Sequence, residues 1–152
     1  MEFHKILVPV DFSPCSAEAF RTAVVLARQF KAELLVLHVA DSRILDALGE
    51  TGAQAEEVKN RFQKRAREQL RSFLSEDPSD VKIRRITATG VPFQEIVKTT
   101  RLEKAQLIVM GRSGGTGELE KIFFGSTAEK VVRLAPCAIL TVPLAEEKPK
   151  SA

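Results

Sequence analysis

Short apolar runs alternate with stretches of helical periodicity along the whole chain of 152 residues. Nearly continuous apolar runs occupy residues 6–10, 34–39, 106–110 and 138–142, and apolar and polar residues alternate over residues 81–87. Runs that stay apolar at successive positions are typical of strands covered on both faces in a parallel sheet. The pattern therefore predicts five strands, of which the third has one wetter face.

Between these runs, apolar residues recur three or four positions apart, which predicts four helices. The first begins with the hydroxyl cap Ser13 and with Pro14 in its first turn, and it ends near Phe30. Residues 41–54 have only a weak pattern, and we expect a mobile lid or a partial helix there. The other three helices carry their apolar stripes over residues 58–73, 93–102 and 128–134.

Regular alternation of strands and helices predicts an α/β fold with parallel strands joined by right-handed crossovers. The first, second and fourth strands are the most apolar, so we expect them in the interior. A single doubly wound five-stranded parallel sheet of order 3-2-1-4-5, a Rossmann-like fold, meets this condition. Ligands bind such a sheet where the strand order reverses, here between the first and fourth strands. Asp11 and Gly111 directly follow these strands, so we expect both at one crevice.

Glycine is concentrated after the fourth strand, where five of the eight glycines lie between residues 111 and 125. A loop without side chains lets the backbone approach a ligand closely. The next helix opens at Ser126 and Thr127, and a helix N-terminus presents free N–H groups and the positive end of a dipole. This combination predicts a phosphate site. Residues 126–129 also have the spacing of a capping box, which by itself would account for Ser126.

The predicted phosphate site lacks the parts of a fast nucleotide hydrolase. No GxxxxGK[ST] sequence is present, so no lysine is placed to reach a γ-phosphate. Backbone N–H groups, the Ser126 and Thr127 hydroxyls, Arg112 and a divalent cation would neutralise a triphosphate, which favours binding over hydrolysis. Across the crevice, Asp11 is suited to accept from an adenine amino group or a ribose hydroxyl, or to help hold Mg²⁺. Its alternative role is to cap the helix near Ser13.

Charge excludes some classes of partner. The chain has 23 basic and 20 acidic residues and a net charge of +3. Its densest basic segment, residues 59–71, is interleaved with glutamates, so a solvated helix face is expected rather than a nucleic-acid site. No apolar run approaches the length of a membrane span, and the N-terminus lacks the features of a signal peptide. We therefore expect a cytoplasmic protein without nucleic-acid or membrane partners.

The remaining residues with reactive side chains are expected to be structural. Cys15 and Cys137 form no metal-type cluster and are expected to stay reduced. His38 lies at the end of the second strand and is also expected to have a structural role. We expect one domain over residues 1–145 and a disordered, charged tail over residues 146–152.

Four blocks of this sequence, in order, resemble the universal stress protein family. They are residues 6–13 (ILVPVDFS), residues 37–39 (LHV), the glycines from Gly111 to Gly125 with Ser126, and residues 136–143 (PCAILTVP). The resemblance spans essentially the whole chain and implies an adenine nucleotide alpha hydrolase-like fold. The ATP-binding branch carries the motif G-x2-G-x9-G-[ST] and binds ATP along the crevice, usually with Mg²⁺ or Mn²⁺.

The resemblance also implies the residues that bind the nucleotide. Asp11 would recognise the adenosine end, and Pro9 and Val10 would line the base pocket. The backbone of Val39 would contact adenine, and Met110 would pack near the nucleotide. The phosphates would be held by Gly111, Gly114, Gly125, Ser126 and Thr127.

The glycine loop departs from the family motif by one residue. Ten residues, not nine, separate Gly114 from Gly125. Counting from Gly115 restores nine, but Arg112 then stands where the motif has its first glycine. A one-residue insertion within residues 117–120 accounts for the spacing, since insertions in loops cost little. It leaves open which residues contact the metal and the γ-phosphate, and whether Gly115 replaces or joins Gly114.

The leading functional prediction is an ATP-binding, nucleotide-gated stress-response module that acts as a homodimer and is not a fast enzyme. The family commonly dimerises through antiparallel pairing of the fifth strand, and an unpaired apolar edge from Ile139 to Val142 would invite aggregation. No catalytic residue is assigned. A slow ATPase or autophosphorylating enzyme stays open as an alternative, as does an interaction protein that has lost nucleotide binding. An unidentified protein partner is compatible with each of these functions.

Overall fold

The computed structural model describes residues 1–49, 51–76, 78–114 and 124–145. Gly115, the predicted insertion and the predicted tail therefore lie outside the described residues. The helices and strands follow one another as β1 (Lys5–Pro9), α1 (Pro14–Phe30), β2 (Glu33–Asp41), α2 (Ser42–Ala47), α3 (Gly52–Phe73), β3 (Ile83–Gly90), α4 (Pro92–Glu103), β4 (Leu107–Gly111), α5 (Ser126–Leu134) and β5 (Ala138–Val142).

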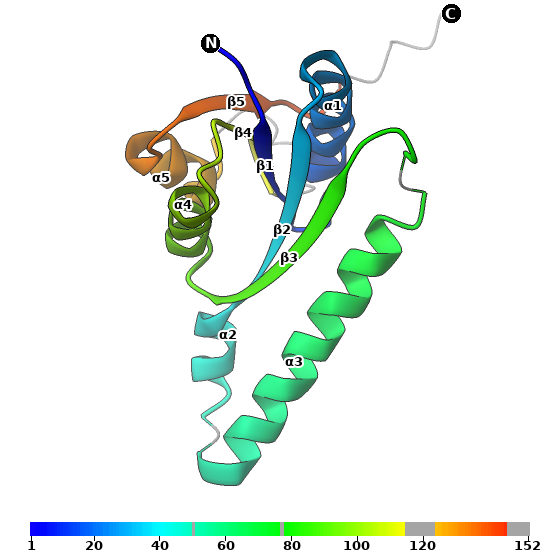
Figure 1. Cartoon of the computed structure of the whole chain (residues 1–152). Helices are drawn as coiled ribbons and strands as arrows, with labels where there is room; N and C mark the ends of the chain where they lie inside the picture. Colours follow the sequence, from blue (N-terminus) through cyan, green and yellow to red (C-terminus); the bar gives the residue numbers. More distant parts are fainter. Residues whose placement is uncertain (50, 77, 115–123, 146–152) are drawn as a thin grey trace, which may run out of the picture.

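The strands form one parallel sheet in the order β3-β2-β1-β4-β5. This confirms the predicted fold class and the predicted strand order. Helices α1 and α3 cover one face of the sheet, and α4 and α5 cover the other (Figure 1). The result is a three-layer arrangement in which β1, β2 and β4 are interior strands.

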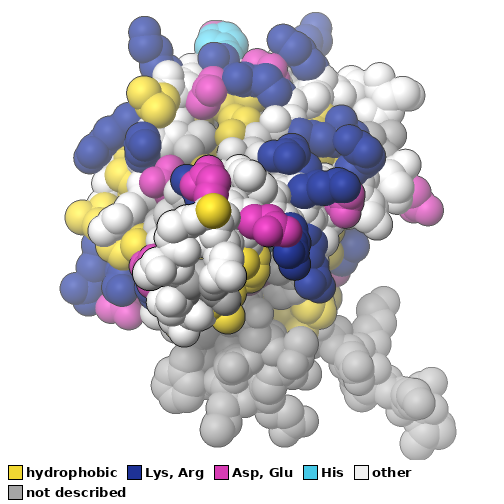
Figure 2. Space-filling model, turned by 90° about the horizontal axis from the view of Figure 1, so that it is seen from below, with side chains coloured by type: hydrophobic (Ala, Val, Ile, Leu, Met, Phe, Trp, Pro, Cys, Tyr) yellow, Lys and Arg dark blue, Asp and Glu magenta, His cyan; other side chains and the backbone are white. Residues whose placement is uncertain are grey.

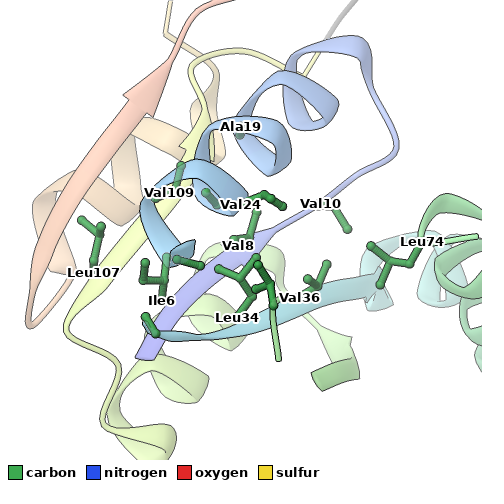
Figure 3. Close-up of a cluster of buried hydrophobic side chains, with 14 of the residues drawn as sticks. Ile6, Val8, Val10, Ala19, Val24, Leu34, Val36, Leu74, Leu107 and Val109 are labelled. Carbon is green, nitrogen blue, oxygen red and sulfur yellow. The ribbon is translucent and has the colours of Figure 1, made fainter. Parts of the chain in front are cut away.

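Burial on both faces explains why the interior strands are apolar at successive positions. On β1, Ile6 and Val8 belong to the core under α1 and α3, whereas Leu7 between them belongs to the core under α4 and α5. Figure 3 shows the first of these cores, where Val8 and Val109 of neighbouring strands lie below α1. Each side of the sheet thus has its own apolar core.

β1 and β4 are paired over only part of their length. Their register ends with Leu7 opposite Ile108, whereas β1 stays paired with β2 through Pro9. Successive N–H groups along a strand point alternately to its two neighbours, and the Val10 N–H bonds the Leu37 carbonyl of β2 at 2.8 Å. The backbone nitrogen of residue 9 therefore faces β4, and because this residue is Pro9 it has no N–H to donate to that strand. The ladder stops, and the sheet opens between the carboxyl ends of β1 and β4.

Several boundaries differ from the sequence-based prediction. The segment after β2 contains the short helix α2, which agrees with the partial helix expected within residues 41–54 and brings the helices of the described residues to five. Helix α3 begins at Gly52, six residues before the predicted apolar stripe, because its first turns are mostly exposed and carry no stripe. β2 continues to Asp41, and β3 runs over Ile83–Gly90 instead of residues 81–87.

Among the described residues, no helix combines the length and the apolar character needed to cross a membrane.

Helix α3 is held by few buried side chains, which leads to a first prediction. Of its 22 residues, only Ala66 and Leu70 are buried. Leu70→Ala is expected to lower the free energy of unfolding by about 2–5 kcal/mol, because it removes a core side chain and leaves a cavity. Urea denaturation measures this loss. The same change at Leu102, which is 72% exposed on α4, should stay within about 0.5 kcal/mol; equal losses would contradict the packing described.

Candidate functional site

A cavity of about 990 Å³ opens at the carboxyl edge of the sheet. It extends from the ends of β1 and β2 across the opened β1–β4 crevice to the start of α5, with α3 and α4 contributing walls. Figure 2 views the molecule from this side and shows Lys and Arg side chains on several parts of its rim, most densely on the right of the picture. Cavities of this size and position commonly bind small molecules and cofactors.

The structure brings the predicted site residues together around this one cavity. Every described member of the predicted set lines it, and Gly115 lies outside the described residues. The lining members are Pro9, Val10, Asp11, Val39, Met110, Gly111, Arg112, Gly114, Gly125, Ser126 and Thr127.

Gly111 is required by packing between β4 and α1. A Cβ at this position would lie 3.0 Å from Cys15 Sγ and 3.1 and 3.2 Å from the backbone carbonyl carbon and oxygen of Cys15. Cys15 is itself buried, and its Sγ donates to the Val142 carbonyl at 3.2 Å. The end of β4 is therefore pressed between α1 and β5, and its glycine has a structural reason independent of any ligand.

The glycines on the two sides of the loop have different surroundings. A Cβ at Gly114 would lie 2.6 Å from Asp11 Oδ2, which puts the loop against the carboxylate across the crevice. A Cβ at Gly125 would make only ordinary contacts at 3.5–3.6 Å. The loop is closed by the Gly125 N–H, which donates to the Arg112 carbonyl at 2.9 Å, and the Arg112 N–H donates to the Val142 carbonyl at 2.8 Å.

The predicted capping box at Ser126 is wrong. Gly125 is the N-cap of α5, and Ser126 is the first residue inside the helix. A hydroxyl caps a helix only from the N-cap position, where the backbone is extended. The first backbone bond of the helix runs from the Glu129 N–H to the Gly125 carbonyl at 3.0 Å. The N–H groups of the three preceding residues therefore have no acceptor within the helix, and these residues line the cavity.

The two carboxylate oxygens of Asp11 have different surroundings. Its Oδ1 accepts from the Ser13 N–H at 3.0 Å, while its Oδ2 faces Gly114. The Ser13 hydroxyl caps α1 as predicted, accepting from the Ser16 N–H at 3.2 Å. One carboxylate oxygen thus fixes the turn into α1, and the other is directed toward the glycine loop.

The turn that carries Asp11 has a strained backbone and an aromatic support. Phe12 has φ = 65°, a left-handed conformation that costs a residue other than glycine about 1–3 kcal/mol. Its ring lies 4.3 Å from the His38 ring and 5.6 Å from the Phe73 ring. His38 also lines the cavity. The sequence predicts only a general structural role for His38 and does not single out Phe12, because nothing in the local pattern indicates this contact.

Arginine side chains line the α3 side of the cavity. Arg43 pairs with Asp41 at 2.6 Å, and its hydrogen bond lowers the pKa of Asp41, so the two groups form a neutral pair at neutral pH. Arg61 pairs with Glu57 of the preceding helical turn at 2.6 Å. This flank is therefore less positive than its arginine content suggests.

Neither the second large cavity nor the cysteines form a rival site. A cavity of about 1020 Å³ lies between α2, α3 and β3, but none of the described members of the predicted set lines it. Burial raises the pKa of the half-buried Cys137, which keeps its thiol protonated. Among the described residues, no group of three or more His, Cys, Asp and Glu side chains could hold a metal ion.

The fold and the crevice define a class of protein, the doubly wound α/β proteins that bind ligands at a strand-order reversal. Comparisons with known proteins identify the family within this class. The model of the universal stress protein family matches residues 2–143. The chain belongs to the universal stress protein family.

Individual relatives support this membership over the full length. The chain is 36% identical to the universal stress protein MJ0531 of Methanocaldococcus jannaschii over 149 residues, covering 97% of this chain and 84% of the relative. The solved structure of MJ0577 from the same organism has a TM-score of 0.80 and 29% identity, and the match covers 97% of this chain and 100% of that chain.

More distant family members have been solved with adenine nucleotides. A universal stress protein in complex with cAMP has a TM-score of 0.62 and 18% identity, over 95% of this chain and 100% of that chain. A universal stress protein from Archaeoglobus fulgidus in complex with dAMP has a TM-score of 0.57 and 20% identity, and the match covers 93% of this chain and 99% of that chain. At these identities the likeness shows a common fold.

The close approach of Gly111 to Cys15 leads to a second prediction. Gly111→Ala is expected to lower the free energy of unfolding by about 1–3 kcal/mol, because backbone atoms of α1 have to move. Gly125→Ala is the matched control, and its loss should stay below about 1 kcal/mol. Urea denaturation of both ligand-free variants measures the difference. A fully stable Gly111→Ala variant would disprove the packing role.

Proposed function

We propose that this protein binds an adenine nucleotide, ATP foremost, in the crevice between β1 and β4, and that it acts as a nucleotide-gated stress-response module in the cytoplasm. One observation carries the proposal. The N–H groups at the start of α5, the Asp11 carboxylate and the apolar side chains of Val10 and Met110 all line the same cavity. Phosphates, ribose hydroxyls and a purine base are the matching parts of an adenine nucleotide.

In this proposal each part of the nucleotide has its own set of residues. The base packs among Pro9, Val10 and Met110 and contacts the backbone of Val39. Asp11 accepts from the ribose hydroxyls with the oxygen that faces the loop. Family members solved with cAMP and dAMP support the choice of an adenine nucleotide. The phosphates are held by Gly111, Arg112, Gly114, Gly115, Gly125, Ser126 and Thr127.

A divalent cation enters this site with the nucleotide rather than before it. The described lining of the cavity contains two carboxylates, Asp11 and Asp41, and Asp41 already pairs with Arg43. Mg²⁺ prefers octahedral oxygen coordination and is usually bound through one or two carboxylates together with substrate phosphates. Mg²⁺ or Mn²⁺ would therefore be held mainly by nucleotide phosphates and water, because the two oxygens of Asp11 are assigned to the Ser13 N–H and to the ribose hydroxyls.

The proposal describes a binding module rather than an enzyme. Backbone N–H groups and the Ser126 and Thr127 hydroxyls stabilise a bound phosphate in its ground state. Fast phosphoryl transfer additionally needs a positioned base or water-orienting group and a cation directed at the transition state, and the proposal assigns no residue to these roles. Nucleotide occupancy of the cavity, rather than turnover, would then change the surface that α2, α3 and the loop present to partners.

Ser126→Asp tests the phosphate end of the site. Ser126 is exposed in the first turn of α5, where a carboxylate favours the helix dipole but repels phosphate. The variant is expected to bind ATP at least about tenfold more weakly, to bind adenosine as the wild type does, and to lose no stability. Isothermal titration calorimetry with ATP and adenosine, combined with urea denaturation, measures these three quantities.

Two further measurements complete this test. Gln29→Glu makes the same change in net charge at an exposed position of α1 and should leave ATP affinity unchanged. Mass spectrometry of the wild-type protein after denaturation identifies any nucleotide that was purified with it. A wild-type protein that carries no nucleotide and ignores ATP up to millimolar concentration would reject the proposal.

The same proposal includes a homodimer formed through β5. Within the part of the chain that the structure describes, β5 pairs only with β4 and is an edge strand of the sheet. Leu140 on this strand is 39% exposed. An exposed apolar edge presents unpaired backbone groups to another chain, and antiparallel pairing from Ile139 to Val142 with a second copy would satisfy them.

Leu140→Lys tests the dimer. A lysine on an edge strand opposes pairing because charge would be brought to the strand-strand interface, so the variant is expected to be a monomer where the wild type is a dimer. Sedimentation at micromolar concentration distinguishes the two states. Leu102→Lys, at a more exposed leucine of α4, should remain dimeric. A monomeric wild type would reject this part of the proposal.

A further inference from the structure

His38 contacts both residues that flank Asp11. Its Nδ1 lies 2.9 Å from the Val10 carbonyl oxygen, on the residue before Asp11. Its ring packs on the ring of Phe12, the residue after Asp11, with 4.3 Å between ring centroids. One side chain on β2 therefore holds the backbone on one side of Asp11 and the side chain on the other.

This double contact follows from the register of the sheet. Pro9 is opposite Leu37 on the neighbouring strand, so the chain places Val10 beside His38. The Val10 N–H bonds the Leu37 carbonyl at 2.8 Å, and its carbonyl oxygen lies against the His38 ring nitrogen. The backbone of β1 is thus tied to β2 up to the residue immediately before Asp11, although β1 has already left β4.

The conformation of Phe12 needs such a support. Its φ of 65° is unfavourable for an aromatic residue. In this conformation the chain turns sharply, which lets the Ser13 N–H reach Asp11 Oδ1 at 3.0 Å. Release of the Phe12 ring would let the backbone relax to negative φ and would break the geometry of this bond. The orientation of Asp11 Oδ2 toward Gly114 depends on the same turn.

We propose that His38 is a positioning residue, which aims the Asp11 carboxylate at the ribose hydroxyls of the bound nucleotide. This inference rests on the proposed function, since the ribose hydroxyls are the groups from which Asp11 would accept hydrogen bonds. His38 itself does not need to touch the nucleotide. Its Nδ1–H donates to the Val10 carbonyl and its ring supports Phe12, and together these contacts fix the turn that presents Asp11.

The test compares ATP with 2′,3′-dideoxy-ATP, which lacks both ribose hydroxyls. The wild type is expected to bind ATP at least about tenfold more tightly, because the dideoxy analogue offers no donor to Oδ2 of the charged Asp11. His38→Phe keeps an aromatic ring beside Phe12 but removes the donor to Val10. We expect its ATP preference to fall to about twofold or less, while its affinity for the dideoxy analogue stays that of the wild type.

A double-mutant cycle separates positioning from a general loss of structure. Asp11→Ala should also remove the ATP preference, and adding His38→Phe should then have no further effect. Phe20→Leu is the control, because Phe20 contacts Phe73 in the same aromatic cluster at 5.7 Å and is not a neighbour of Asp11 in the chain. It should retain the full preference for ATP.

A measurement without ligand keeps this inference separate from the proposed function. The Ser13 amide proton, bonded to Asp11 in the wild type, should exchange at least about tenfold faster in His38→Phe by NMR and unchanged in Phe20→Leu. Unchanged exchange in His38→Phe, or equal loss of affinity for both nucleotides, overturns the positioning role. If the wild type binds neither nucleotide, the proposed function is rejected, and so is the proposed contact between Asp11 and the ribose. The amide exchange data still decide whether His38 holds the turn.

Discussion

The end of the hydrogen-bond ladder between β1 and β4 is the constraint on which the site depends. Both strands are interior strands with apolar side chains on each face, and each keeps its outer neighbour to the end. Only the contact between them stops early, at a position where Pro9 has no N–H to donate. The sheet therefore stays intact around an opening at its centre. Its backbone groups are satisfied on the outer sides, and the carboxyl ends of two rigid strands form the walls of the crevice.

The two walls are fixed by different means. The end of β4 is held by close packing, because Gly111 lies against the backbone of Cys15 and the next residue is bonded to β5. The end of β1 is held by hydrogen bonds and ring contacts to β2, through Val10, Phe12 and His38. A rigid wall on each side keeps Asp11 and the start of α5 at a fixed separation, which is what a ligand with several binding groups requires.

The sequence was sufficient to predict the sheet, because buried parallel strands leave apolar runs and helices leave stripes. It also located the crevice, since Asp11 and Gly111 each follow a strand that the pattern places in the interior. It failed where the outcome depends on backbone angles. Ser126 and Glu129 have capping-box spacing, yet the extended residue is Gly125. The sequence did not predict the first turns of α3 as helix, because exposed residues such as Gln54 and Glu56 form no apolar stripe. The role of His38 depends on a cross-strand neighbour far away in the sequence.

The sparse anchoring of α3 has a consequence for the dynamics of the cavity. Its two buried side chains, Ala66 and Leu70, both lie in the C-terminal half of the helix, and the N-terminal half contributes no fully buried side chain. Opening of that half exposes little apolar surface and leaves the strands paired, and its free energy is therefore far below that of global unfolding. The part of α3 that lines the site cavity lies within residues 61–69 and contains the buried Ala66. Local opening of the N-terminal half would therefore widen mainly the neighbouring cavity between α2, α3 and β3, which Ala55 and Val58 line, and would leave the β1–β4 crevice in place.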